Sequence, residues 1–210
     1  REEFAQKKGG ERIPRPPYFR HMEEVNLNGG LPPARRTGDT ALLPADDFAE
    51  SAKDERIYDT RLPEAFAGAH IPDSYSIWQG GLPVFGGWLA DNDSPIYLVT
   101  SSNEDVDPAV HHLSNIGLDN VRGALAGGFE AWRDAGKNLR QSTATTPRAL
   151  KEMEQTPQLL DVRETDEFES GHIPNAINCY VGYLEDEISD LPLDKDRPLV
   201  VTCGVGHRAG

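Results

Sequence analysis

The chain has 210 residues, of which 37% are hydrophobic and 8% aromatic, a composition typical of one large or two small globular domains. Its 35 acidic and 21 basic residues give a formal net charge of −14, which argues against nucleic acid and anionic membranes as partners. No apolar stretch approaches the roughly 18–20 residues of a membrane-spanning helix, and the charged first residues lack a signal-peptide core. We therefore expect a soluble, cytoplasmic protein.

Residues 1–41 differ in character from the rest of the chain, because five prolines and five glycines interrupt regular structure. This composition favours a linker. Four apolar side chains could nevertheless anchor the segment on a neighbouring domain: Tyr18, Phe19, Met22 and Val25.

Residues 42–138 show strands alternating with helices, which predicts a parallel α/β sheet whose sites gather at the carboxyl ends of the strands. We expect strands at 55–59, 94–100 and from 121 onwards. We expect helices at about 62–68, 107–116 and 127–136, the second of them capped by Gly117.

The chain contains an internal repeat. Asp59-Thr60-Arg61 recurs as Asp161-Val162-Arg163, and His70-Ile71-Pro72 recurs as His172-Ile173-Pro174, both at an offset of 102 residues. A constant offset over this span predicts two copies of one domain in tandem. Asp161 and Arg163 lie at a strand end, where we expect a structural ion pair that shapes the following cysteine loop rather than a direct catalytic role. Each His is expected to make a structural hydrogen bond, since both copies carry it.

Residues 139–146 read as the interdomain linker and residues 147–210 as the second domain. The second copy stops soon after the position that matches Thr100 and lacks about a third of the first copy. We therefore expect the chain, which begins without methionine, to be an excerpt of a longer protein, with low turnover in this truncated form.

The strongest chemical signal is Cys203, which follows the apolar strand 199–202 and opens the loop Gly204-Val205-Gly206-His207-Arg208. Such a loop can turn successive backbone N–H groups inward and hold an anion. His207 and Arg208 add positive charge, so Cys203 is a candidate nucleophile in its thiolate form. The other cysteine, Cys179, lies in an apolar stretch and is expected to be buried. Two cysteines without Cys-x-x-Cys spacing predict neither a disulfide framework nor a zinc site.

These motifs resemble the rhodanese (sulfurtransferase) homology domain. The second copy carries the Asp-x-Arg motif, the Phe168-x3-His172-Ile173-Pro174 motif and the cysteine loop, and the first copy carries the closing Gly127-Gly128-x3-Trp132. Residues 1–35 are similar to the tail that follows a metallo-β-lactamase-fold domain. Together they resemble the C-terminal part of metallo-β-lactamase–rhodanese fusions, some of which are persulfide dioxygenases. The metal motif of that missing domain does not occur in these residues, so dioxygenase activity cannot reside here.

The resemblance implies a sulfur-transfer chemistry at Cys203, which would take a sulfane sulfur as a persulfide and pass it to a thiol or cyanide. The N–H groups of Gly204, Val205, Gly206, His207 and Arg208 would cradle the sulfur, and His207 and Arg208 would attract an anionic donor such as thiosulfate or a persulfide. Asp161 and Arg163 would support the loop. No cofactor and no metal are implied.

The first copy lacks a cysteine at the matching place. A constant offset selects Ser101, whereas alignment on Pro95 and Pro198 selects Thr100. Neither hydroxyl can form a persulfide, and Glu104 and Asp105 would repel an anion, so we interpret residues 42–138 as a non-catalytic copy.

Two alternatives remain open at this level. A cysteine phosphatase of related fold would have five residues between cysteine and arginine, whereas four separate Cys203 from Arg208. A non-catalytic scaffold would use both copies only to position a metalloenzyme domain. The sequence also leaves the oligomeric state open, including a homo-oligomer.

Overall fold

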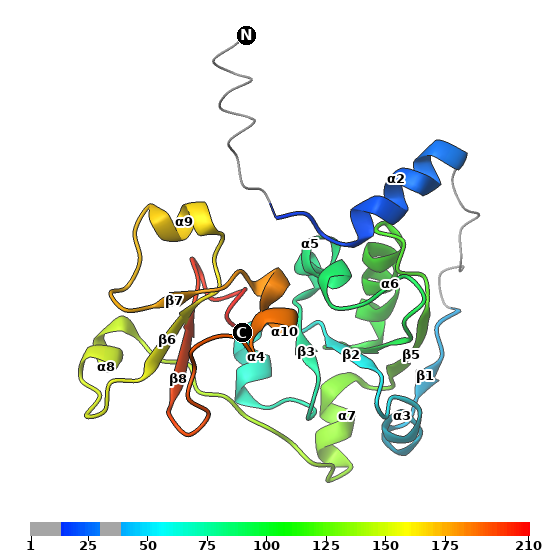
Figure 1. Cartoon of the computed structure of the whole chain (residues 1–210). Coiled ribbons are helices and arrows are strands. Elements are labelled where there is room, and N and C mark those ends of the chain that lie inside the picture. Colours follow the sequence, from blue (N-terminus) through cyan, green and yellow to red (C-terminus); the bar gives the residue numbers. More distant parts are fainter. Residues whose placement is uncertain (1–13, 30–38) are drawn as a thin grey trace. The chain divides into compact units, whose positions relative to one another are not determined.

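The computed structural model describes residues 14–29 and 39–210, which fall into two compact units, one formed by residues 16–29 and 39–149 and the other by residues 150–209 (Figure 1). Much of the segment that resembles a metallo-β-lactamase tail lies outside the described residues. Within the described part of the chain, no helix combines the length and apolar character needed to cross a bilayer.

The first unit is built on a five-stranded sheet in the order β1-β5-β4-β2-β3, with every neighbouring pair parallel. Its strands are β1 (Leu42–Leu43), β2 (Arg56–Asp59), β3 (Tyr75–Ser76), β4 (Ile96–Val99) and β5 (Val121–Leu125). The three central strands are rich in buried residues, as expected for a parallel sheet covered on both faces.

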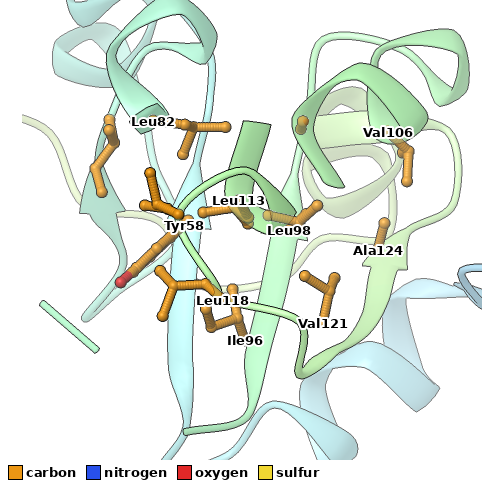
Figure 2. Packing of buried hydrophobic residues seen from close by; sticks show 12 residues of the cluster. Tyr58, Leu82, Ile96, Leu98, Val106, Leu113, Leu118, Val121 and Ala124 are labelled. Atoms are coloured by element: carbon orange, nitrogen blue, oxygen red, sulfur yellow. The ribbon is translucent and has the colours of Figure 1, made fainter. Parts of the chain in front are cut away.

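Helices cover both faces of this sheet (Figure 1). They are α3 (Ala45–Ser51), α4 (Pro63–Gly68), α5 (Leu82–Phe85), α6 (Val106–Ser114) and α7 (Gly128–Asp134), with single 3₁₀ turns η1 (Gln79–Gly81), η2 (Gly86–Trp88) and η3 (Asn103–Asp105). The apolar residues of α5 and α6 pack on one face around Tyr58, Leu98 and Val121 (Figure 2). Those of α3 and α7 pack on the other face around Val99 and Leu125. The predicted α/β architecture is confirmed.

The N-terminal segment contains a helix, α2 (Tyr18–Asn28), which packs on the first unit. The Tyr18 hydroxyl donates to the carbonyl of Pro83 over 3.1 Å. The Tyr18 ring lies so close to Gly87 that a Cβ there would overlap it. The Met22 sulfur would lie 3.2 Å from a Cβ added to Gly117, which is a tight contact. Residues 18–28 thus form a docked helix rather than a linker, and two of the four side chains expected to anchor the segment, Tyr18 and Met22, lie at its contacts.

The first unit continues further along the chain than the sequence predicts. Arg140 exchanges two backbone hydrogen bonds with His70, at 2.9 and 3.0 Å, and the amide of Ser142 donates to the carbonyl of Ala67 over 2.9 Å. Part of the predicted linker 139–146 is thus tied to the turn after α4. Such backbone pairing leaves no pattern in the side chains, so the sequence could not reveal it.

The second unit has a three-stranded parallel sheet in the order β7-β6-β8. Its elements are β6 (Gln158–Asp161), α9 (Thr165–Glu169), β7 (Ile177–Asn178), η4 (Val181–Tyr183), α10 (Leu184–Glu187) and β8 (Leu199–Thr202), and α8 (Pro147–Lys151) lies at its start. Leu160, Val162 and Cys179 form the centre of its core. The order β7-β6-β8 repeats the order β3-β2-β4 of the first unit, as the internal repeat predicts.

Candidate active site

Cys203 lies one residue beyond the carboxyl end of β8, beside the end of β6. Asp161 pairs with Thr202 in the ladder between these strands, and the half-buried Cys203 comes next. The amide of Gly206 donates to the Cys203 sulfur over 3.1 Å. Gly206 has a φ of +94°, a conformation that a side chain would strain, so the loop needs glycine here. The loop therefore directs at least one N–H dipole at the thiol.

The remaining loop residues differ in exposure. Gly204 and Val205 face solvent, Val205 at 82%, whereas His207 and Arg208 are half-buried. The amide of Ala209 donates to the carbonyl of Gly206 over 3.3 Å, which closes the loop as a turn. Within the predicted cradle of N–H groups from Gly204 to Arg208, the described contacts include one amide that donates to the Cys203 sulfur, that of Gly206.

Asp161 and Arg163 form an ion pair at the mouth of this loop. The Arg163 Nε lies 2.9 and 3.1 Å from the two Asp161 oxygens, and Nη2 lies 2.7 Å from Oδ2. Arg163 also donates to the carbonyl of Gly171 over 2.9 Å. The hydrogen bond to Asp161 raises the pKa of Arg163 above its ordinary value. The pair therefore ties the end of β6 to the turn that precedes His172.

Asn178, at the end of β7, holds the same strand end from the other side. Its side-chain amide donates to the carbonyls of Asp161 and Arg163, both over 2.9 Å. The corresponding residue of the first unit, at the offset of 102, is Ser76, whose buried hydroxyl has no hydrogen-bond partner there. Asn178 is thus a feature of the cysteine-bearing unit.

Arg208 is held by Glu167 of α9. Its two terminal nitrogens donate to the two Glu167 oxygens over 2.6 and 2.8 Å. The hydrogen bonds from Arg208 lower the pKa of Glu167, which keeps the carboxylate ionised at neutral pH. The guanidinium lies next to the loop, because a Cβ added to Gly204 would be 3.7 Å from its Nη2. The sequence predicts that Arg208 attracts an anionic donor, but in the structure the Glu167 carboxylate already binds its guanidinium.

The two repeated histidines make the structural hydrogen bond that the sequence predicts. Nδ1 of His172 lies 2.9 Å from the carbonyl of Phe168, and the two rings stack with centroids 3.7 Å apart. His70 and Phe66 show the same distance of 2.9 Å and a stacking distance of 3.9 Å. The first unit, which has no cysteine in its loop, shows the same arrangement, so these histidines have a structural role.

A cavity of about 470 Å³ lies beside the thiol. It is lined by Asp161, Arg163, Gly171, His172, Ile173, Thr202 and Cys203. In the first unit the equivalent place is filled by α7. There Phe129 lies over the Arg61 guanidinium, with 3.7 Å between Cζ and the ring centroid, and its amide donates to the carbonyl of Thr100. The loop and its charges, rather than the size of this cavity, distinguish the Cys203 site.

The strand register identifies the first-unit counterpart of Cys203 as Thr100. Asp59 pairs with Val99 and Asp161 pairs with Thr202, so the offset is 102 in the first strand of each pair and 103 in the second. Ser101, which the constant offset selects, therefore corresponds to Gly204. Thr100 is fully buried and donates its hydroxyl to the carbonyl of Ser102 over 2.8 Å. The correction arises because the second repeat has one extra residue between its second and third strands.

Cys179 is a core thiol, as its apolar surroundings predict. It is 4% exposed, and burial raises its pKa to about 11, with a further contribution from Glu187. Its sulfur lies 3.5 Å from a Glu187 oxygen. Both cysteines are free thiols, and the two are chemically distinct.

Sequence reasoning assigned no role to Glu167 or Asn178. A signal for Glu167 was available in the repeat itself. Glu167 corresponds to Ala65 of the first copy at the offset of 102, and Arg208 corresponds to Asp105 at the offset of 103. An acid and a base that appear together in one copy and are both missing from the other indicate a pair.

The fold and the site define a pair of parallel α/β units, one of which presents a cysteine in a glycine-bearing loop after a central strand. The family model of the Rhodanese-like domain matches residues 44–135 and 146–210. The chain belongs to the Rhodanese-like domain family. No curated protein matches the chain.

Several solved structures are similar in fold. A thiosulfate sulfurtransferase from Pseudomonas aeruginosa is 21% identical, with a TM-score of 0.41; the alignment covers 91% of this chain and 42% of that one. The structure of SseA from Escherichia coli, titled as a 3-mercaptopyruvate sulfotransferase, is 19% identical over 80% and 89%, with a TM-score of 0.43. A possible tyrosine phosphatase from Rhodopseudomonas palustris is 24% identical over 62% and 98%, with a TM-score of 0.39. This chain thus spans less than half the length of the Pseudomonas enzyme.

Proposed function

We propose that the chain is a sulfurtransferase module in which Cys203 carries a sulfane sulfur atom as a persulfide. The observation that carries this proposal is the thiol at the end of β8, which accepts the Gly206 N–H over 3.1 Å in a loop that also bears Arg208. The membership of the Rhodanese-like domain family supports the same chemistry. The first unit, with the buried Thr100 in the equivalent place, is non-catalytic in this proposal.

The reaction has two balanced steps. The Cys203 thiolate attacks the outer sulfur of a donor such as thiosulfate, a new S–S bond forms, the donor's S–S bond breaks, and sulfite leaves with the electron pair. The terminal sulfur of the persulfide is then attacked by cyanide or a thiolate, which restores the Cys203 thiolate. The Gly206 N–H is positioned to stabilise negative charge on sulfur in both steps.

The supporting groups hold the loop in place for this chemistry. The Asp161–Arg163 pair and Asn178 tie the strand end that lies beside Cys203, and Glu167 holds Arg208. None of these contacts needs to change when a single sulfur atom is added to the thiol. The small size of the transferred atom therefore suits a loop that is already braced on both sides.

Mass spectrometry after treatment with thiosulfate tests the proposal. We expect an added mass of about 32 Da, one sulfur atom, on the peptide that contains Cys203, and its loss on addition of cyanide with release of thiocyanate. Cys203→Ser should abolish the adduct, whereas Ser101→Ala in the first unit should leave it unchanged. Absence of any sulfur adduct with thiosulfate, an organic thiosulfonate and an organic persulfide would contradict the proposal and favour the scaffold alternative. Hydrolysis of a phosphate ester that depends on Cys203 would favour the phosphatase alternative.

Three further expectations stay predictions. They are a cytoplasmic location, the absence of nucleic acid and membrane partners, and a role beside a metallo-β-lactamase-fold domain in persulfide metabolism.

A further inference from the structure

Both guanidinium groups near Cys203 are bound by carboxylates. Arg163 is held in a two-oxygen contact by Asp161, and Arg208 is held in the same way by Glu167. The two ion pairs also influence each other, because Glu167 and Arg208 both contribute to the pKa of Arg163. The thiol belongs to the same group of charges, since Cys203 contributes to the pKa of Arg208. The two ion pairs form one cluster around the thiol in which the positive and negative charges balance.

The Glu167–Arg208 pair is partly shielded from water. The Arg208 side chain is 19% exposed and that of Glu167 is 39% exposed. A two-oxygen contact between carboxylate and guanidinium fixes geometry as well as charge. Glu167 therefore determines both where the Arg208 guanidinium lies and how much net positive charge a molecule near the thiol experiences.

The pair occurs only in the unit that has the cysteine. The first unit has Ala65 and Asp105 at the corresponding places, and its loop contains a capping box between Ser102 and Asp105 instead. The Asp–Arg pair and the His–Phe stack, by contrast, are present in both units. The Glu167–Arg208 contact is thus associated with the thiol and not with the common fold.

We propose that Glu167 is a positioning residue that determines donor specificity: it holds Arg208 on the Cys203 loop and cancels its charge, so the site favours singly charged over doubly charged sulfur donors. The surrounding charge acts in the same direction, since residues 150–210 contain thirteen acidic and five basic side chains. When the local cation is neutralised, the electrostatic attraction of a doubly charged anion to the site falls more than that of a singly charged anion. This inference rests on the proposed function where it concerns sulfur donors.

Alkylation of Cys203 tests the charge of the site independently of any sulfur transfer. Iodoacetate is an anion and iodoacetamide is neutral, so the ratio of their rate constants reports the local potential at the thiol. Glu167→Gln keeps the shape of the side chain and should raise this ratio about fivefold. Arg208→Gln leaves the carboxylate unpaired and should lower it. Glu169→Gln removes the same charge from the same helix and should leave the ratio near that of the parent chain.

The rates are compared at one neutral pH, because several other charged groups face the thiol. Asp161, Arg163 and His172 line the cavity with Cys203, and His207 lies in the loop. Peptide mapping separates Cys203 from the buried Cys179. If the role of Glu167 were purely structural, the rate constants of both reagents would change in proportion. Their ratio would then stay constant in Glu167→Gln and in Arg208→Gln. That result, or a change of the same sign in both variants, overturns the proposal.

Donor kinetics then test specificity. Thiosulfate carries two negative charges, and methanethiosulfonate carries one with a comparable sulfane sulfur. We expect the parent chain to form the Cys203 adduct faster with methanethiosulfonate, and Glu167→Gln to shift the rate ratio toward thiosulfate by about fivefold. An unchanged donor ratio overturns the specificity role. If neither donor gives an adduct while the alkylation ratios shift as expected, the proposed function fails and the charge role of Glu167 stands.

Discussion

The phenyl ring of Phe129 lies over the guanidinium of Arg61, 3.7 Å from its Cζ, and so seals the Asp59–Arg61 ion pair inside the first unit. The equivalent Asp161–Arg163 pair of the second unit lines a cavity. The same ion pair is thus buried to two different degrees in one chain, which allows its energetic contribution to be compared directly.

Asp59→Asn should destabilise the first unit more than Asp161→Asn destabilises the second. Arg61 is 8% exposed, so the first substitution leaves a buried charge without its partner and should cost about 3–5 kcal/mol. Arg163 is 19% exposed, and water can partly solvate it, so about 1–3 kcal/mol is expected for the second substitution.

Urea unfolding can follow the two units separately. All three tryptophans, Trp78, Trp88 and Trp132, lie in the first unit, so their fluorescence reports that unit. Reaction of the buried Cys179 thiol reports the second. Equal losses of stability for both substitutions would contradict the comparison.

Gly128→Ala should destabilise the first unit through a steric clash. Its φ is +65°, and an added Cβ would lie 2.6 Å from the carbonyl oxygen of Thr100, a backbone atom that cannot rotate away. Gly136 has a φ of +67° with no atom within 4 Å of a built Cβ, so Gly136→Ala is the matched control. We expect about 1–2 kcal/mol for the control, from the left-handed backbone alone, and a larger loss for Gly128→Ala in tryptophan-monitored unfolding. A similar loss in both variants would show that α7 can shift.

The two cysteines should differ in reactivity in the native chain. Burial raises the pKa of Cys179 to about 11, so almost no thiolate is present at neutral or mildly alkaline pH, and the side chain is 4% exposed. Iodoacetamide should therefore label Cys203 and spare Cys179 until urea is added. Native Cys203→Ser should take up almost no label, and rapid labelling of that variant would contradict the buried position of Cys179.

The contribution of Glu167 to stability should disappear in acid. Its pKa in the folded chain lies below its ordinary value of 4.5, because Arg208 stabilises the carboxylate. A depressed folded-state pKa means that the stabilisation is complete above about pH 4.5 and is lost as pH falls through the folded value. Glu167→Gln should therefore lower the stability of the second unit at pH near neutrality by about 1 kcal/mol or less, since the pair is partly exposed.

This prediction is checked by the protection of the Cys179 thiol from reaction as urea is added. The measurement is made in the parent chain and in Glu167→Gln, near pH 7 and in acid. The difference between the two chains should shrink as the pH falls. A difference that persists in acid would assign the effect to packing rather than to charge.

The alternation of apolar runs and turn residues was sufficient to predict the main strands β2, β4 and β5 and the helices α4, α6 and α7. The repeat predicted the two units and the shared Asp–Arg and His features. Periodicity is local, so it could not show that α2 docks through Tyr18 against Gly87, nor that Arg140 pairs with the backbone of His70. Short strands of two residues, such as β3 and β7, are also below the length at which a pattern is visible.

For the site, the position of Cys203 could be predicted because strand, glycine and cation follow one another in sequence. The contact between Arg208 and Glu167 spans 41 residues, so no local pattern shows it, and only the comparison of the two copies could have indicated the pair. The counterpart in the first unit needed the strand register, since a single extra residue moves it from Ser101 to Thr100.

The coverage of Thr100 by α7 has a consequence for protein engineering. Replacing residues 100–105 with the loop 203–208, together with Ala65→Glu, would reproduce the second unit's thiol, glycines and paired arginine within the first. A cysteine at position 100 would nevertheless start from the fully buried position of Thr100, whose carbonyl accepts the Phe129 N–H. Restoring the nucleophile alone would therefore not give the first unit a thiol that a donor can reach.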